Sequence, residues 1–63
     1  MEVNERIILL MKENNLRQKD LVRLTGASKA TVNQWVSGAI TPSNKYDLLL
    51  AKALNTSVGH LIH

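Results

Sequence analysis

Apolar residues recur along the chain at the spacing of helix faces. Residues 3–14 carry apolar side chains three or four positions apart, which predicts an amphipathic helix with the face Val3, Ile7, Leu10 and Met11. The pair Asn14 and Asn15 favours turn conformations, so we expect this helix to stop there. No stretch alternates with a period of two, and no internal repeat occurs. The pattern therefore predicts an all-α fold.

The same spacing predicts two further helices near the middle of the chain. A short helix over 18–25 has Leu21 and Leu24 facing inward, and Gly26 supplies the left-handed residue that commonly follows a helix. Ser28 is a good N-cap for a third helix that runs to about residue 37. Gly38 then ends this helix in the same manner as Gly26 ends the one before it.

Two more helical segments complete the chain. Pro42, followed by Ser43 and Asn44, opens a fourth helix that Asn55 closes. Its inward face is predicted to comprise Tyr46, Leu49, Leu50, Ala53 and Leu54. A last short turn, capped by Thr56 or Ser57, carries Val58, Leu61 and Ile62. We therefore expect five short helices in one compact domain over residues 1–63.

The segments 18–25 and 29–37 are joined by a three-residue turn that begins with glycine, which is the pattern of a helix-turn-helix unit over about residues 18–37. The second helix of this unit has two unlike sides. One side is apolar and comprises Val32, Trp35 and Val36, and the other comprises Lys29, Ala30, Asn33, Gln34 and Ser37. The polar side contains no acid, so its amide, small and cationic groups suit base edges and phosphates.

The segment QKDLVRLTGASKATVNQWVSG, residues 18–38, resembles the DNA-binding domain of phage repressor and Cro proteins, the lambda repressor-like family. The resemblance covers nearly the whole chain and rests on the ordered set Gln18, Leu21, Gly26, Val32, Trp35, Gly38, Pro42 and Leu54. Several positions depart from the family pattern, two of them where the second and third predicted helices cross. Val22 stands where members usually have a small residue, often Ala, and Thr25 stands where they have an apolar one.

The resemblance implies that the helix over about 29–37 enters the major groove of double-stranded DNA. It implies base contacts from Lys29, Ala30, Asn33 and Gln34, with Lys29 donating to guanine, Gln34 pairing with adenine and Ala30 touching a thymine methyl. For Ala30 the alternative is a passive small residue that permits close approach, and for Asn33 it is a side chain left in water. Phosphate contacts are expected from Arg17, Gln18, Lys19, Ser28 and Lys45.

The charge distribution agrees with a phosphate-facing surface. The formal net charge is +3, yet residues 17–45 hold five basic residues and one acid, a balance of +4, which leaves −1 for the rest of the chain. A positive middle with a near-neutral remainder is typical of a surface that meets nucleic acid. A solvated helical face remains the alternative.

Composition excludes several classes of function. The 63 residues include no cysteine, and the only histidines, His60 and His63, have no partner ligands, so we expect no metal site. No apolar run approaches 18 residues, which argues against a membrane span. An enzyme pocket needs walls of more chain than this. We therefore expect a cytoplasmic binding protein that is not an enzyme, with no cofactor and no small-molecule substrate.

The leading hypothesis is a sequence-specific transcriptional regulator that binds a pseudo-palindromic DNA operator. A weak homodimer that forms mainly on DNA is expected, with Ile40, Val58 and Ile62 at its interface, although these residues would equally suit ordinary core. We favour a complete small protein over the front domain of a longer repressor. The alternatives are a helical protein-interaction module that never meets DNA and an antitoxin-type regulator that also binds a protein.

Overall fold

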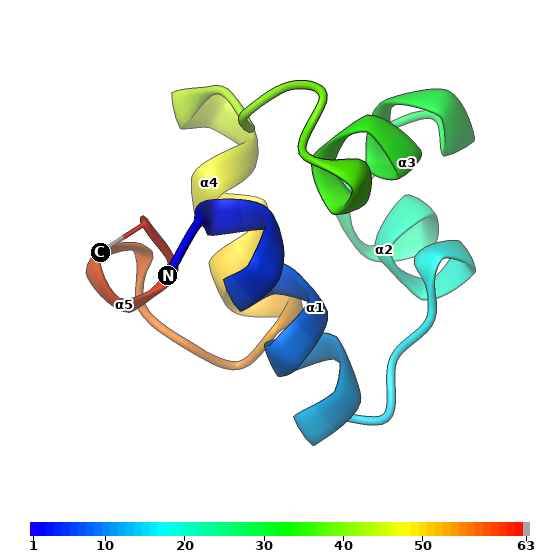
Figure 1. Ribbon diagram of the computed structural model, residues 1–63. Coiled ribbons are helices and arrows are strands. Elements are labelled where there is room, and N and C mark those ends of the chain that lie inside the picture. Colours follow the sequence, from blue (N-terminus) through cyan, green and yellow to red (C-terminus); the bar gives the residue numbers. More distant parts are fainter. Residues whose placement is uncertain (63) are drawn as a thin grey trace.

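The computed structural model describes residues 1–62, which form five helices (Figure 1). These are α1 (Val3–Glu13), α2 (Gln18–Thr25), α3 (Lys29–Ser37), α4 (Asn44–Ala53) and α5 (Val58–Ile62). No strand occurs among the described residues, so the predicted all-α, five-helix architecture is confirmed.

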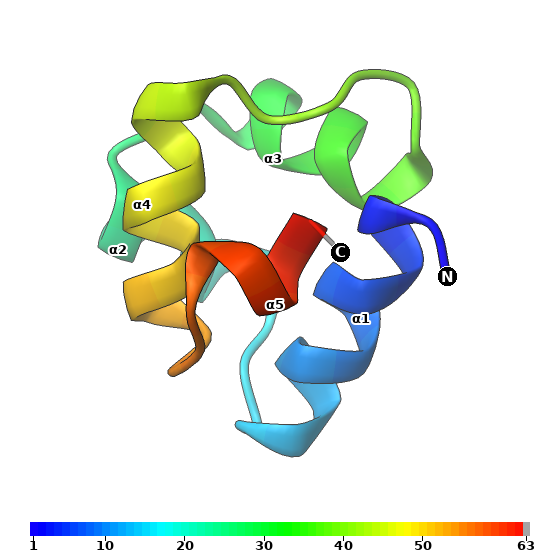
Figure 2. The same ribbon diagram turned by 90° about the vertical axis from the view of Figure 1, so that its left-hand side faces the viewer.

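One core, mostly aliphatic, holds the helices together. Its fully buried side chains come from all five helices and are Ile7, Leu21, Val32, Trp35, Leu50, Leu54 and Leu61. Helix α1 packs on α3 and α5, α2 packs on α3 and α4, and α5 also contacts α4. Figure 2 shows α5 lying between α1 and α4. Because helices of this length are marginal alone, mutual burial of these side chains, at about 1.5–3 kcal/mol each, stabilises them.

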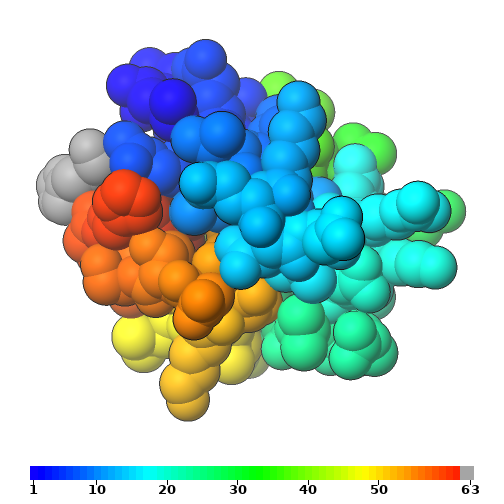
Figure 3. All heavy atoms as spheres, turned by 90° about the horizontal axis from the view of Figure 1, so that it is seen from below, coloured from blue at the N-terminus to red at the C-terminus, as the bar shows by residue number. Residues whose placement is uncertain are grey.

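The end of α1 is tied to the end of α4 by one side chain. The amide nitrogen Nδ2 of Asn14 donates to the carbonyl oxygen of Leu10 at 2.8 Å and to that of Leu54 at 2.9 Å. Figure 3 shows the light-blue end of α1 against the orange segment that follows α4. Asn14 therefore satisfies two helix-terminal carbonyls at once, which fixes the lower edge of the bundle.

The inward orientation predicted for Leu24 is wrong. Leu21 is fully buried, whereas Leu24 keeps 41% of its surface exposed. Seen down the axis of α2, at 100° per residue, the buried side begins at Leu21 and continues through Thr25 towards Val22. Leu24 lies about 60° from Leu21 in the opposite direction, and so outside the buried side. Thr25, 6% exposed, takes the inward place that the apolar pattern had given to Leu24.

Candidate nucleic-acid interface

The turn between α2 and α3 is fixed by hydrogen bonds around a left-handed glycine. Gly26 has φ of +77°, a conformation that a residue without Cβ adopts at no steric cost. The buried Thr25 hydroxyl donates to the Leu21 carbonyl oxygen at 2.6 Å and accepts the backbone N–H of Ala27 at 3.2 Å. Both hydrogen-bonding roles of the hydroxyl are thus filled, which explains how a polar residue fits where α2 and α3 cross.

Ser28 begins α3 as predicted. Its Oγ accepts the backbone N–H of Thr31 at 3.1 Å and donates to Oγ1 of Thr31 at 2.9 Å. The serine hydroxyl is therefore engaged in capping the helix. A contact from this hydroxyl to a phosphate, which the resemblance implied, would compete with its hydrogen bond to Thr31, and that contact remains a prediction.

Helix α3 has one buried and one exposed face. Val32 and Trp35 are 0% and 1% exposed. On the other side, the structure brings four predicted base-contacting residues together at the surface, namely Lys29, Ala30, Asn33 and Gln34. No acidic residue occurs in α3. The helix therefore presents donors, amides and a small side chain outward while its opposite flank is anchored.

The anchor behind α3 is aromatic. The ring centroids of Trp35 and Tyr46 lie 5.1 Å apart with the planes tilted by 56°. The Nζ atom of Lys45 lies 5.4 Å from the centroid of the Tyr46 ring, within cation–π distance. The start of α4, which carries the exposed Lys45, is thus positioned relative to α3 by the Trp35–Tyr46 contact.

The start of α2 carries three predicted phosphate contacts. Arg17 and Lys19 are exposed and Gln18 is half-buried. The backbone N–H of Arg17 donates to Oδ2 of Asp20 at 2.8 Å, and this hydrogen bond, together with the Arg23 guanidinium 3.4 Å away, lowers the pKa of Asp20. Asp20, the one acid within residues 17–25, is therefore held as a carboxylate that accepts the backbone N–H of the N-cap residue of α2.

A surface hollow of about 220 Å³ lies between the start of α2 and the start of α3. It is lined by Gln18, Lys19, Val22 and Lys29, which come from α2 and from the first residue of α3. The sequence pattern did not indicate this hollow. The one available signal was Val22, a branched residue where the family resemblance led us to expect a small one.

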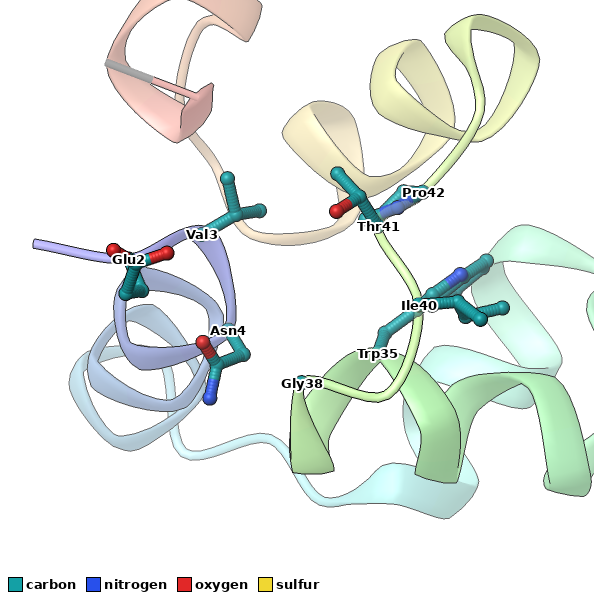
Figure 4. Close-up of a pocket in the computed structure, with 8 residues that line it drawn as sticks. All are labelled: Glu2, Val3, Asn4, Trp35, Gly38, Ile40, Thr41 and Pro42. Atoms are coloured by element: carbon teal, nitrogen blue, oxygen red, sulfur yellow. The ribbon is translucent and has the colours of Figure 1, made fainter.

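The residues predicted for a dimer interface have unlike environments. Ile40 is 43% exposed, whereas Val58 is half-buried against the core. The side chain of Ile62, like the whole of His63, lies outside the described residues. Ile40 edges a cavity of about 70 Å³ between the start of α1 and the loop before α4 (Figure 4). Such a cavity is far below the roughly 300 Å³ at which small-molecule sites begin.

Gly38 has a second requirement besides its φ of +85°. A Cβ at this position would lie 3.1 Å from Nδ2 of Asn4, so the loop after α3 approaches the start of α1 closely. Figure 4 shows Asn4 and Gly38 facing each other across this junction. The glycine therefore sets where α3 ends and how closely α1 packs beside it.

Asp47 is a buried acid that the sequence analysis did not single out. It is 7% exposed on the core side of α4, and its Oδ1 atom has no hydrogen-bond partner among the described residues. Burial raises the pKa of this carboxyl. Within residues 1–62, no group of three or more His, Cys, Asp or Glu side chains could hold a metal ion. None of the helices in this range is long and apolar enough to cross a membrane.

The second and third helices of this five-helix bundle form a tight helix-turn-helix, and α3 has an exposed polar face without acids. These features define a helix-turn-helix DNA-binding protein. The model of the Cro/C1-type HTH DNA-binding domain matches residues 6–63, and the chain belongs to this family. It is therefore a sequence-specific DNA-binding regulator, and the family resemblance inferred from the sequence is confirmed.

A solved structure with the same architecture is that of the P22 c2 repressor protein in complex with synthetic operator 9T in the presence of Tl⁺. The two chains are 31% identical, with a TM-score of 0.90, and the similarity covers 98% of this chain and 94% of that one. A comparison with curated proteins gives no match.

Proposed function

We propose that this chain is a repressor-like transcriptional regulator that places α3 in the major groove of a pseudo-palindromic operator. The observation that carries the proposal is the division of α3 into a buried flank, Val32 and Trp35, and an exposed acid-free face. That face would read bases through Lys29, Ala30, Asn33 and Gln34. Lys29 is suited to guanine O6 and N7, Gln34 to adenine N6 and N7, and Ala30 to a thymine methyl.

Contacts to the DNA backbone would flank this face. The exposed cations Arg17, Lys19 and Lys45 and the amide of Gln18 are the side chains that we assign to phosphates, with Ser28 as a further contact. These residues lie at or just before the starts of α2, α3 and α4, where backbone N–H groups add to the attraction for an anion. The operator in the similar P22 c2 repressor complex supports extension of this binding mode to the present chain.

We also propose a weak homodimer that forms on the operator. Half-sites read by one helix each lie about one helical turn, or 34–36 Å, apart. The longest dimension of the Cα trace is 24 Å, so two copies at this spacing leave about 10 Å between their Cα traces, a gap that side chains bridge only over a small area. Ile40 is the exposed apolar residue that we place there. Val58 and Ile62 complete the proposed interface, although Val58 gives part of its surface to the core of its own chain.

The proposed function is binding without catalysis, in the cytoplasm, where operator DNA is available. The test is a salt titration with a duplex selected from random sequences. Each neutralised phosphate contributes a log–log slope of about −0.9, so Arg17, Lys19 and Lys45 predict about −3 per copy. A flat salt profile would favour a protein-interaction module. Sedimentation of free and duplex-bound protein tests the dimer, which should appear only on a duplex with two half-sites.

A further inference from the structure

The hollow between α2 and α3 has walls made mostly of carbon. Val22 contributes its branched, half-buried side chain to the lining. Gln18, Lys19 and Lys29 complete the lining, and long polar side chains of this kind lay their carbon stems along apolar surface while their ends stay in water. The volume of about 220 Å³ is several times the roughly 30 Å³ that one water occupies in the liquid, so the hollow has room for a group as small as a methyl.

This hollow is continuous with the DNA-contacting face. One wall is Lys29, which we assign to a base, and another is Gln18, which we assign to a phosphate. A duplex docked on α3 would therefore cover the hollow. A phosphate gains little from carbon walls, and a trapped water needs two to four polar partners. The apolar group that a base pair exposes in the major groove is the C5-methyl of thymine.

We propose that the hollow lined by Gln18, Lys19, Val22 and Lys29 receives the C5-methyl group of an operator thymine next to the base pair that Lys29 contacts. Val22 is then a specificity-determining residue, although it lies on α2 rather than on the helix that enters the groove. This inference rests on the proposed function, because it requires α3 to be in the major groove. It adds a second thymine preference, from α2, to the one that we assign to Ala30 on α3.

The experiment replaces each thymine of a selected duplex in turn by deoxyuridine, which removes only the methyl group. One buried methyl stabilises binding by about 0.8 kcal/mol, so the affinity for one substituted duplex should fall about fourfold. In Val22→Ala the response at that same position should shrink below about twofold, because the wall that the methyl contacts is gone. Leu24→Ala, on the same helix but outside the hollow, should leave the fourfold response unchanged.

A second variant separates loss of the methyl contact from loss of folding. Val22→Thr keeps the shape of the side chain and replaces a methyl by a hydroxyl, so it should weaken the same thymine response. Circular dichroism shows whether each variant is folded. Duplexes that bind with no thymine response dependent on Val22 would overturn the inference and leave the proposed function intact. A response that persists in both folded variants belongs to another contact, such as Ala30, and also counts against it. Failure to bind any duplex at low salt overturns the proposed function itself.

Discussion

The indole of Trp35 packs against the phenol ring of Tyr46, with 5.1 Å between ring centroids and a tilt of 56°. Tilted pairs of this kind contribute about 0.5–1.5 kcal/mol beyond the area they bury. The contact joins the buried flank of α3 to the first turn of α4. The helix that faces DNA is therefore held from behind by the same aromatic pair that positions Lys45 at the surface.

Trp35→Ala should destabilise the domain by about 3–5 kcal/mol, because it removes the largest fully buried side chain. A domain of 63 residues has a total stability of only about 3–9 kcal/mol, so this variant should lose about a third of its stability or more. Chemical denaturation followed by circular dichroism measures the change. Gln34→Ala, one position earlier on the exposed face, is the matched control and should stay within about 0.5 kcal/mol of the parent.

Gln34→Ala and Lys45→Ala should affect DNA binding in different ways. Gln34→Ala should cost about 1–3 kcal/mol at one operator position and relax the base preference there. Lys45→Ala should weaken binding to all sequences alike and make the salt slope shallower by about one. Affinities for a set of singly substituted operators, measured at several salt concentrations, separate the two effects. Identical behaviour of the two variants would contradict the assignment of one to bases and the other to phosphates.

Ser28→Ala should lower the free energy of unfolding by about 1 kcal/mol, because the Thr31 backbone N–H loses its acceptor at the start of α3. Ser43 is the N-cap residue of α4, but its side chain makes no capping hydrogen bond. Ser43→Ala is therefore the control and should cost less. Urea denaturation of the two variants tests this, and equal losses would argue against the capping role of Ser28.

Asp47→Leu should stabilise the domain at pH 7 by about 1–3 kcal/mol, because it removes a buried carboxyl whose Oδ1 atom has no hydrogen-bond partner within residues 1–62. The folded-state pKa of Asp47 is raised above the ordinary 3.8, so the folded protein binds the proton more readily than the unfolded chain does. The cost of Asp47 is therefore full at neutral pH and falls as the pH drops through the raised pKa. Denaturation midpoints from pH 7 to pH 4 should show the gain from Asp47→Leu shrinking.

Asp20→Asn is the control of opposite sign. The hydrogen bond from the Arg17 backbone N–H lowers the pKa of Asp20, so its stabilising contribution is present above the unfolded pKa of 3.8 and is lost as the pH falls through the lowered value. Asp20→Asn should therefore destabilise the protein at neutral pH. A gain from Asp47→Leu that stays constant down to pH 4 would show that the buried carboxyl is not the source of the cost.

The sequence was sufficient to predict the helices because local signals mark their ends. Gly26 and Gly38 both adopt positive φ directly after a helix, and Ser28 caps the next one, as their residue types indicate. The spacing also predicted the two faces of α3 correctly. Trp35 lies on the same side of the helix as Val32, and a large apolar residue there is expected in the core. These features depend on neighbours within one turn of helix, so a single sequence contains them.

Features set by packing between helices were not predictable in the same way. Leu24 was assigned inward from its apolar character, but the direction of the core as seen from α2 depends on where α3 and α4 lie. The place of Asp47 on the buried side of α4 contradicts its residue type, so hydropathy could not reveal it. The hollow beside Val22 arises from side chains on two helices, and its existence depends on their crossing geometry.

The most direct test of the central claim is an NMR titration of the uniformly labelled protein with a selected duplex. If α3 enters the major groove, the largest amide shifts should fall on residues 29–34 and 17–19, with smaller ones at Lys45. The exposed side of α1 around Leu9 should be unaffected. Large shifts confined to α1 and α5, with the amides of α3 unchanged, would contradict the account.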